Sequence, residues 1–139
     1  MIIADTGFWL ALQHREDAFH PKAVSALKSI NEPLITTTPV LSETCYLLQR
    51  ELGWTAPIRL LQSIDAGLAQ LDDFRENDLL RVVQLMKKYR ELPMDMVDAS
   101  LVILAEKLGH GRILSTDRRD FKTYRWKNTK PFLNLLEQE

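Results

Sequence analysis

Cysteine is almost absent from this chain of 139 residues, since Cys45 is the single example. One cysteine excludes an internal disulfide bond and suits a reducing compartment, and we expect Cys45 to be a packed, inert thiol. Long hydrophobic runs are missing too, because no apolar stretch approaches the roughly 18–20 residues that a membrane-spanning helix needs. The first residues lack the basic region and small-residue cleavage site of a secretory signal. We therefore expect a soluble, cytoplasmic protein with no membrane partner.

Histidine and glycine motifs of several enzyme classes are also lacking. The three histidines, His14, His20 and His110, show no paired spacing. Their spacing disfavours a zinc site and gives little support to RNA cleavage by histidine acid–base catalysis. No glycine-rich phosphate loop occurs, which argues against a nucleoside triphosphatase. The Gly-x-Ser-x-Gly element of serine hydrolases is absent as well.

Net charge is small, at −1, and gives no global indication of a nucleic-acid partner. Its distribution is uneven, because residues 107–130 contain eight Lys or Arg and two Asp, a net charge of +6, and the rest of the chain carries −7. A basic segment of this size can attract a polyanion. Charge alone favours a simpler interpretation, a solvated surface, so the segment needs independent support.

Apolar residues make up 45% of the sequence, which is ordinary for a protein with a packed core. The length suits one domain over residues 1–139, and short apolar strands alternate with helical patterns. That alternation predicts a three-layer α/β/α sandwich with a short, mainly parallel sheet. The predicted strands are 1–5, 34–37, 68–71, 112–116 and 124–126. The predicted helices are 6–15, 20–30, 39–52, 55–66, 77–91 and 95–108, with a tight turn or short helix at 117–121.

Two aspartates directly follow predicted strands, and parallel sheets bind ligands beyond the carboxyl ends of their strands. Asp5 ends the apolar run of residues 2–4, and Asp117 follows the predicted strand 112–116. The alternative for both is structural, because aspartate is a preferred N-cap of a following helix or turn. For Asp5 the two interpretations are evenly balanced, whereas the matching strand-end position of Asp117 favours a functional role.

Two further acids lie beside the apolar stripes of predicted helices. Glu43 has Val40 and Leu47 as its stacked neighbours, and Asp98 is followed one turn later by apolar residues. A charge beside an apolar stripe needs a cation or a partner, because burial of an unpaired charge is costly. The structural alternatives are that Glu43 reaches solvent and that Asp95 and Asp98 form a variant of the capping box.

The acids as a group are harder to explain structurally than each acid alone. Asp120, three residues after Asp117, is expected to pair with a neighbouring arginine. Carboxylate oxygens are the ligands that Mg²⁺ and Mn²⁺ prefer in proteins. The sequence therefore predicts a catalytic, metal-binding group with Mg²⁺ or Mn²⁺ as cofactor. Its four acids are Asp5, Glu43, Asp98 and Asp117.

The order of these residues resembles that of the PIN domain family, in particular the VapC-like toxins of type II toxin–antitoxin systems. The resemblance runs over essentially the whole chain and is most specific from Asp98 through the segment Thr116-x-Asp117-x-x-Asp120-Phe121. It implies a short parallel sheet flanked by helices, with the four acids around one or two divalent ions. The supporting candidates that it implies are Thr6, Asp95, Thr116 and Asp120.

The activity implied by this resemblance is that of an endoribonuclease, which hydrolyses RNA phosphodiester bonds with a metal-activated water. The resemblance also implies RNA as the substrate, a cognate antitoxin protein and a homodimer. Five cations near Asp117 are candidates for phosphate contacts, which would give affinity without sequence choice. These cations are Arg118, Arg119, Lys122, Arg125 and Lys127.

Three alternatives stay open at this point. A DNA-directed nuclease could use the same acids, since nothing in the sequence separates DNA from RNA. A phospho-accepting signalling module built on Asp5 is less favoured, because the strand-end position is Thr116-Asp117 and not the lysine that such a module needs. A catalytically silent PIN-like binding module would lack metal binding at the four acids. The RNA target is not named by the sequence.

Overall fold

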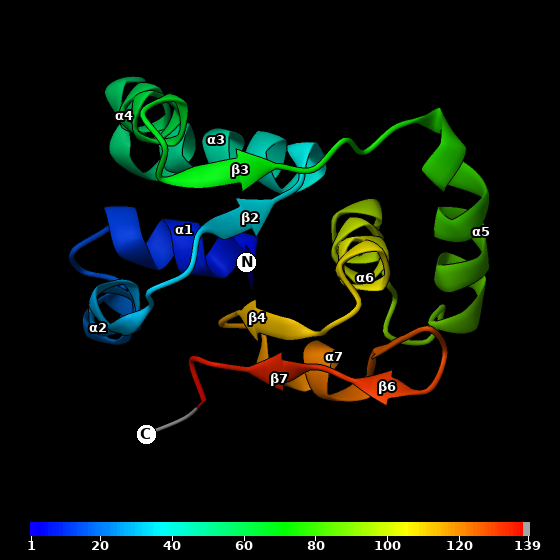
Figure 1. The fold of residues 1–139 in the computed structure, drawn as a ribbon. Helices are drawn as coiled ribbons and strands as arrows, with labels where there is room; N and C mark the ends of the chain where they lie inside the picture. Colours follow the sequence, from blue (N-terminus) through cyan, green and yellow to red (C-terminus); the bar gives the residue numbers. More distant parts are fainter. Residues whose placement is uncertain (138–139) are drawn as a thin grey trace.

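The computed structural model describes residues 1–137, and its centre is a five-stranded sheet in the order β3-β2-β1-β4-β7 (Figure 1). Every neighbouring pair of strands in this sheet is parallel. The single-domain prediction also includes residues 138 and 139, which lie outside the described part. The strands are β1 (Ile2–Ala4), β2 (Leu34–Thr36), β3 (Ala69–Leu71), β4 (Arg112–Leu114) and β7 (Leu133–Asn134).

Helices connect these strands, and four of them begin at a residue whose side chain caps the helix. They are α1 (Thr6–Gln13), α2 (His20–Ser29), α3 (Thr38–Leu52), α4 (Thr55–Asp65), α5 (Leu79–Lys88), α6 (Met96–Leu108) and α7 (Arg118–Thr123). Thr37 caps α3 by accepting a hydrogen bond from the backbone N–H of Val40. α6 ends at Gly109, whose φ of 78° lies in the left-handed region that favours glycine.

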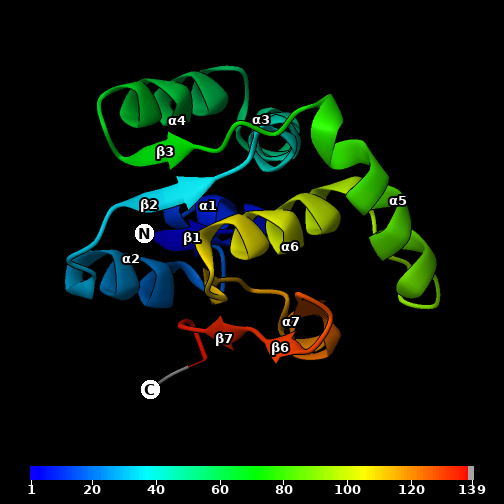
Figure 2. The same ribbon diagram turned by 45° about the vertical axis from the view of Figure 1, so that its right-hand side comes forward.

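The connections wind the sheet in two directions away from β1. The helices α1 to α4 lead from β1 to β2 and β3, whereas α5 and α6 lead back to β4 on the other side of β1. Right-handed crossovers place these two sets of helices on opposite faces, and Figure 2 shows α6 and α1 on opposite sides of β1. The predicted α/β/α layering is therefore confirmed. The direction in which successive strands are added to the sheet reverses between β1 and β4. Doubly wound sheets bind their ligands at such a switch point.

The core packs against both faces of the sheet. Ile3 and Ile113, on the adjacent strands β1 and β4, are fully buried. α6 is buried from Ala99 to Ala105, which explains why its sequence is apolar on nearly every side. Trp9 is fully buried in α1. Within residues 1–137, every helix is too short or too polar to cross a membrane.

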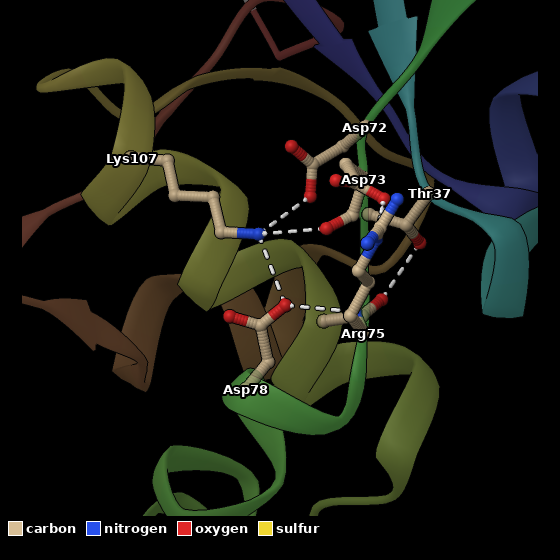
Figure 3. A network of polar contacts seen from close by, with 7 residues as sticks. Thr37, Asp72, Asp73, Arg75, Asp78 and Lys107 are labelled. Carbon is tan, nitrogen blue, oxygen red and sulfur yellow. Dashed lines mark hydrogen bonds and ion pairs between the residues drawn. The ribbon is translucent and has the colours of Figure 1, made fainter.

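The long connection from β3 to α5 is tied to the molecule by ion pairs (Figure 3). Lys107 Nζ, near the end of α6, lies 3.0 Å from a carboxylate oxygen of Asp72 and 3.0 Å from one of Asp78. Asp72 follows β3 directly, and Asp78 comes just before α5. One lysine therefore holds both ends of this connection against α6.

Two predicted elements differ from the structure near the chain's middle and end. The predicted helix 77–91 begins as a 3₁₀ turn, η1 (Glu76–Asp78), and becomes α-helical only in α5. The predicted strand 124–126 is present as β5 (Arg125–Trp126), but it pairs antiparallel with β6 (Lys130–Pro131) in a separate hairpin. β6 and β7 have two residues each, too few to show the period of two by which a strand is predicted.

Candidate active site

Asp5 follows β1 directly, and it is only 6% exposed. Its Oδ1 accepts a hydrogen bond of 2.6 Å from the backbone N–H of Thr6 and so caps α1, and its Oδ2 accepts one of 2.8 Å from Ser115 Oγ. Burial raises the pKa of Asp5 to about 6, and the charges of Asp117 and Glu43 add to this rise against the effect of the two hydrogen bonds. The capping role weighed for Asp5 is present, and it leaves the carboxylate close to other acids.

Asp117 lies on the same side of the sheet, three residues after β4, and caps α7. The predicted strand 112–116 ends at Leu114, so Ser115, and not Asp117, takes the position that matches Asp5. Asp117 Oδ1 accepts a hydrogen bond of 3.0 Å from the backbone N–H of Asp120, and its own backbone N–H donates one of 3.0 Å to Ser115 Oγ. Burial raises the pKa of Asp117, and the charge of Asp120 raises it further. The Ser115 hydroxyl, which donates to Asp5, therefore links the two strand-end acids.

Asp98 approaches the same edge from the first turn of α6. It is half-buried, and its Oδ2 accepts a hydrogen bond of 2.8 Å from the hydroxyl of Tyr124. Burial raises the pKa of Asp98 to about 7, and the charges of Asp95, Asp5 and Asp117 contribute in the same direction. Three acids from three separate elements thus influence one another's ionisation.

The tightest group of carboxylates is formed by Asp98, Asp117 and Asp120. One oxygen from each of these residues lies within 4.8 Å of the others. Asp120 also has the arginine neighbour that the sequence predicts, because Arg119 Nε lies 3.2 Å from its Oδ1. The structure therefore gives Asp120 a second set of neighbours, the acids of the site, which the sequence interpretation did not favour.

Glu43 and Asp95 lie at the margin of this group. Glu43 is half-buried on α3, and its charge is close enough to Asp5 to raise the pKa of that residue. Asp95 is exposed and caps α6, since its Oδ1 accepts a hydrogen bond of 2.9 Å from the backbone N–H of Asp98. The capping role expected for Asp95 is therefore present.

The two threonines predicted as supports lie where α1 meets the segment after β4. Thr6 is buried, and its Oγ1 has no hydrogen-bond partner within residues 1–137. Thr116 packs against Gly7 so closely that a Cβ at Gly7 would lie 1.8 Å from Thr116 Oγ1. Glycine at this position permits the close approach that brings the ends of β1 and β4 together.

Three residues that the sequence interpretation missed support the acids. Ser115 stands directly after β4, and a serine between a buried strand and an acid is a signal that could have been noticed. Tyr124 contacts Asp98 from 26 positions away, and Asn134 contacts Ser115 from 19 positions away. Local sequence patterns carry no sign of contacts over such distances.

Three of the five predicted cations lie on α7 beside the acids, and each also faces a carboxylate. Arg118 and Lys122 lie 4.0 and 3.9 Å from Glu137, and Arg119 faces Asp120. All three are exposed. Partial neutralisation by these carboxylates weakens their attraction for a polyanion without removing it.

The other two predicted cations lie beyond α7. Arg125 Nη1 donates to the backbone carbonyls of the last residues of α7 and of Tyr124, which makes it a helix-terminating contact. Lys127 is exposed at the tip of the β5–β6 hairpin, with its Nζ 5.8 Å from the centre of the Trp126 ring. Lys127 is therefore accessible from solvent, whereas Arg125 is engaged by the fold.

The donor chemistry of the site fits a hard divalent cation. Carboxylate oxygens dominate it, which suits Mg²⁺ or Mn²⁺ and disfavours softer metals. Within the described part of the chain, no ion pair neutralises Asp5, Asp98 or Asp117. The raised pKa values show that crowding and burial of these acids leave negative charge uncompensated, and a bound cation would compensate it.

Comparison with known proteins places this arrangement in a family. The sequence matches the PIN domain family over residues 2–127. It is 25% identical over 124 residues to Ribonuclease VapC26 of Mycobacterium tuberculosis, which covers 89% of this chain and 92% of that protein. The fold is similar, with a TM-score of 0.80 and 24% identity, to that of M. tuberculosis VapC20, described as a sarcin–ricin loop cleaving toxin. This likeness covers 86% of the chain and 92% of VapC20. The chain described here belongs to the PIN domain family.

Proposed function

We propose that this PIN domain is a divalent-metal-dependent endoribonuclease and the toxin of a toxin–antitoxin pair. The observation that carries the proposal is the convergence of Asp98, Asp117 and Asp120 beside buried Asp5 at the switch point of the sheet. Similarity to Ribonuclease VapC26 over most of both chains supports RNA as the substrate. The alternative of a DNA-directed nuclease uses the same acids and is tested with the same protein.

The acids of the chain have separable tasks in this reaction. Asp98, Asp117 and Asp120, together with neighbouring Asp5, would hold a divalent cation, with Glu43 adding negative charge beside it. When bound, Mg²⁺ or Mn²⁺ supplies positive charge that activates a water molecule and polarises the scissile phosphate. The fold orients the carboxylates with hydrogen bonds already present, from Ser115 Oγ and Tyr124 OH among others. Exposed cations on α7 would contact phosphates beyond the cleaved bond.

The decisive experiment measures cleavage of labelled RNAs by wild type and by Asp5→Asn. Asparagine is as good an N-cap as aspartate, so this variant removes the charge while α1 keeps its cap. Asp17→Asn is the matched control, because Asp17 also accepts a backbone hydrogen bond, from Phe19, outside the acidic group. The substrates are transfer RNA, messenger RNA, a sarcin–ricin loop hairpin and single-stranded DNA, each with Mg²⁺, Mn²⁺ or chelator.

We expect RNA cleavage by wild type and Asp17→Asn with metal, and none by Asp5→Asn or with chelator. Cleavage of DNA alone would replace the proposal with the DNA-directed alternative. A folded wild-type protein that binds Mn²⁺ but cuts only one RNA identifies that RNA as the target class. A protein that neither cuts any substrate nor binds Mn²⁺ would be the catalytically silent module instead.

Two exposed apolar surfaces support protein partners. The first, on α3 and α4, includes Tyr46 and Trp54, the latter 69% exposed, and we assign it to the antitoxin. The second, the α5 stripe, we assign to a second copy of the chain. The α5 stripe consists of Leu79, Leu80, Val83 and Met86. Exposed Glu76 precedes α5 and exposed Lys87 lies in its last turn, so two copies of α5 packed antiparallel would bring opposite charges together.

A further inference from the structure

The edge strand β7 reaches the candidate site through one side chain, that of Asn134. β7 pairs with β4, and Asn134 stands opposite Ile113. Its Nδ2 donates a hydrogen bond of 2.8 Å to the backbone carbonyl of Ser115, and its Oδ1 accepts one of 3.1 Å from the backbone N–H of Ser115. Oδ1 also accepts a hydrogen bond of 3.2 Å from the backbone N–H of Leu136.

The side-chain amide of Asn134 makes the hydrogen bonds that the backbone of β7 would make if the strand were longer. The β4–β7 ladder continues to Leu135, whose backbone N–H donates to the carbonyl of Ile113 at 2.7 Å, and the chain then turns away. After Ile113, Ser115 is the next residue whose backbone N–H and C=O point toward β7. The Asn134 side chain hydrogen-bonds to both of these groups. A carboxylate cannot donate to the Ser115 carbonyl, and an aliphatic side chain can satisfy neither group.

Ser115 is the residue that joins the two strand-end acids. It is 1% exposed, and its Oγ donates to Asp5 Oδ2 at 2.8 Å and accepts from the backbone N–H of Asp117 at 3.0 Å. Because Asn134 holds both backbone groups of Ser115, it limits rotation of that peptide and so fixes where the Ser115 hydroxyl lies. A change at Asn134 would therefore be transmitted to Asp5 and Asp117.

We propose that Asn134 is a positioning residue of the acidic site, which acts through Ser115 to set how Asp5 and Asp117 face a divalent cation. The inference rests on the proposed function. It concerns a residue beyond 127, where the match to the PIN domain family ends, so the C-terminal strand adds a support that the matched part of the chain does not contain. Residues that orient metal ligands typically contribute about 10–100-fold to metal affinity.

The test compares Mn²⁺ affinity, measured by electron paramagnetic resonance, in wild type, Asn134→Leu, Ser115→Ala and the double variant. Leucine nearly preserves the volume of asparagine and removes both hydrogen-bonding groups. Leu133→Ala is the control, because it alters the same strand at a side chain that is 48% exposed. Melting temperature is recorded for every variant, and Asn134→Ala replaces the leucine variant if the latter does not fold.

We expect Asn134→Leu and Ser115→Ala each to weaken Mn²⁺ binding at least about tenfold, and Leu133→Ala to leave it within twofold. The double variant should be no weaker than Ser115→Ala alone, because both residues act in one chain of contacts. Mn²⁺ affinity of a folded Asn134 variant equal to that of the wild type would overturn the inference and leave the proposed function standing. Failure of the wild type to bind Mn²⁺ would overturn both.

Discussion

At the scale of single residues, each strongly perturbed acid of the site has a hydrogen-bond donor supplied by the fold. Asp5 accepts from Thr6 and Ser115, and Asp98 accepts from Tyr124. These donors orient the carboxylates before any cation is bound, which is how preorganised metal sites are built. Burial nevertheless raises both pKa values, so the same residues oppose the stability of the metal-free protein near neutral pH.

Replacing Asp98 by asparagine should separate activity from stability. The amide oxygen of the substituted side chain can still accept the Tyr124 hydrogen bond, but the charge that would hold a cation is gone. We expect Asp98→Asn to lower RNA cleavage at least about 100-fold, similar to the loss of one strong electrostatic contact in other active sites. Its metal-free melting temperature at pH 7.5 should rise, by about 3 °C for each kcal/mol of relieved charge burial. Wild-type cleavage by this variant would contradict the assignment.

The pH dependence of stability follows from the same two acids. Their pKa values of about 6 and 7 exceed the ordinary value of 3.8, so the folded metal-free protein binds more protons than the unfolded chain between roughly pH 4 and pH 7. The contribution of these two groups to the free energy of unfolding is therefore largest below that pH window and decreases as the pH rises through it. We expect the melting temperature in chelator to be higher at pH 5 than at pH 8. Mn²⁺ should stabilise most at pH 8, because it binds ionised carboxylates, and an unchanged melting temperature between these pH values would argue against the raised pKa values.

At the scale of elements, α6 connects the acidic site to the long β3–α5 connection. Its first turn carries Asp98, and its last turn carries Lys107, which contacts Asp72 and Asp78. The lysine side chain is 35% exposed, whereas those of Asp72 and Asp78 are 13% and 14% exposed. Two shielded carboxylates therefore depend on one cation to hold the connection in place.

Removal of that cation should cost more than removal of an ordinary surface lysine. We expect Lys107→Met to lower the free energy of unfolding by about 1–3 kcal/mol, because two shielded carboxylates lose their charged partner. Lys28→Met is the control, since Lys28 is exposed at the end of α2, and a change within about 0.5 kcal/mol is expected there. Urea unfolding measures both, and equal midpoints for the two variants would show that the contact contributes nothing.

At the scale of the whole molecule, the fold places the acids at the switch point and leaves the α5 stripe on the surface. Leu80 of this stripe is 72% exposed. Single exposed apolar residues are common, but a row of them along one helix indicates an interaction surface. Glu76, just before α5, and Lys87, in its last turn, make antiparallel pairing with a second copy self-complementary.

A charge on the α5 stripe should therefore change the oligomeric state. We expect Leu80→Glu to shift the protein from dimer to monomer in light scattering at micromolar concentration, with its melting temperature little changed because the side chain is exposed. Trp54→Glu is the control, because it charges the other apolar surface, on α3 and α4, and should leave the dimer intact. A wild-type monomer at all concentrations, or a dimer that survives Leu80→Glu, would remove α5 as the interface.

Local sequence patterns were sufficient for the helices and for most strands of the sheet, but not for β6 and β7, and they supplied the acids as candidates. The apolar run 2–4 predicts β1 because a strand buried on both faces must be apolar throughout. Asp5 directly follows β1 and Asp117 comes three residues after β4, on the edge of the sheet where the carboxyl ends of these parallel strands meet. The helices of the α/β/α layers follow from apolar spacing and from their caps, as at Asp95. The chemistry of the acids as oxygen donors is likewise a property of residue type.

Only the tertiary structure decided which residues support those acids. Ser115 reaches Asp5 across 110 positions, and Asn134 reaches Ser115 from a two-residue strand with no period to detect. Asp120 appears from sequence as the partner of an arginine, and the turn at the start of α7 places it among the acids as well. Burial, which raises the pKa values of Asp5 and Asp98, is equally non-local. The sequence by itself determines which acids are present and their chemistry as oxygen donors. Their hydrogen-bond partners and their pKa values depend on segments far apart in the sequence, which come together only when the chain folds.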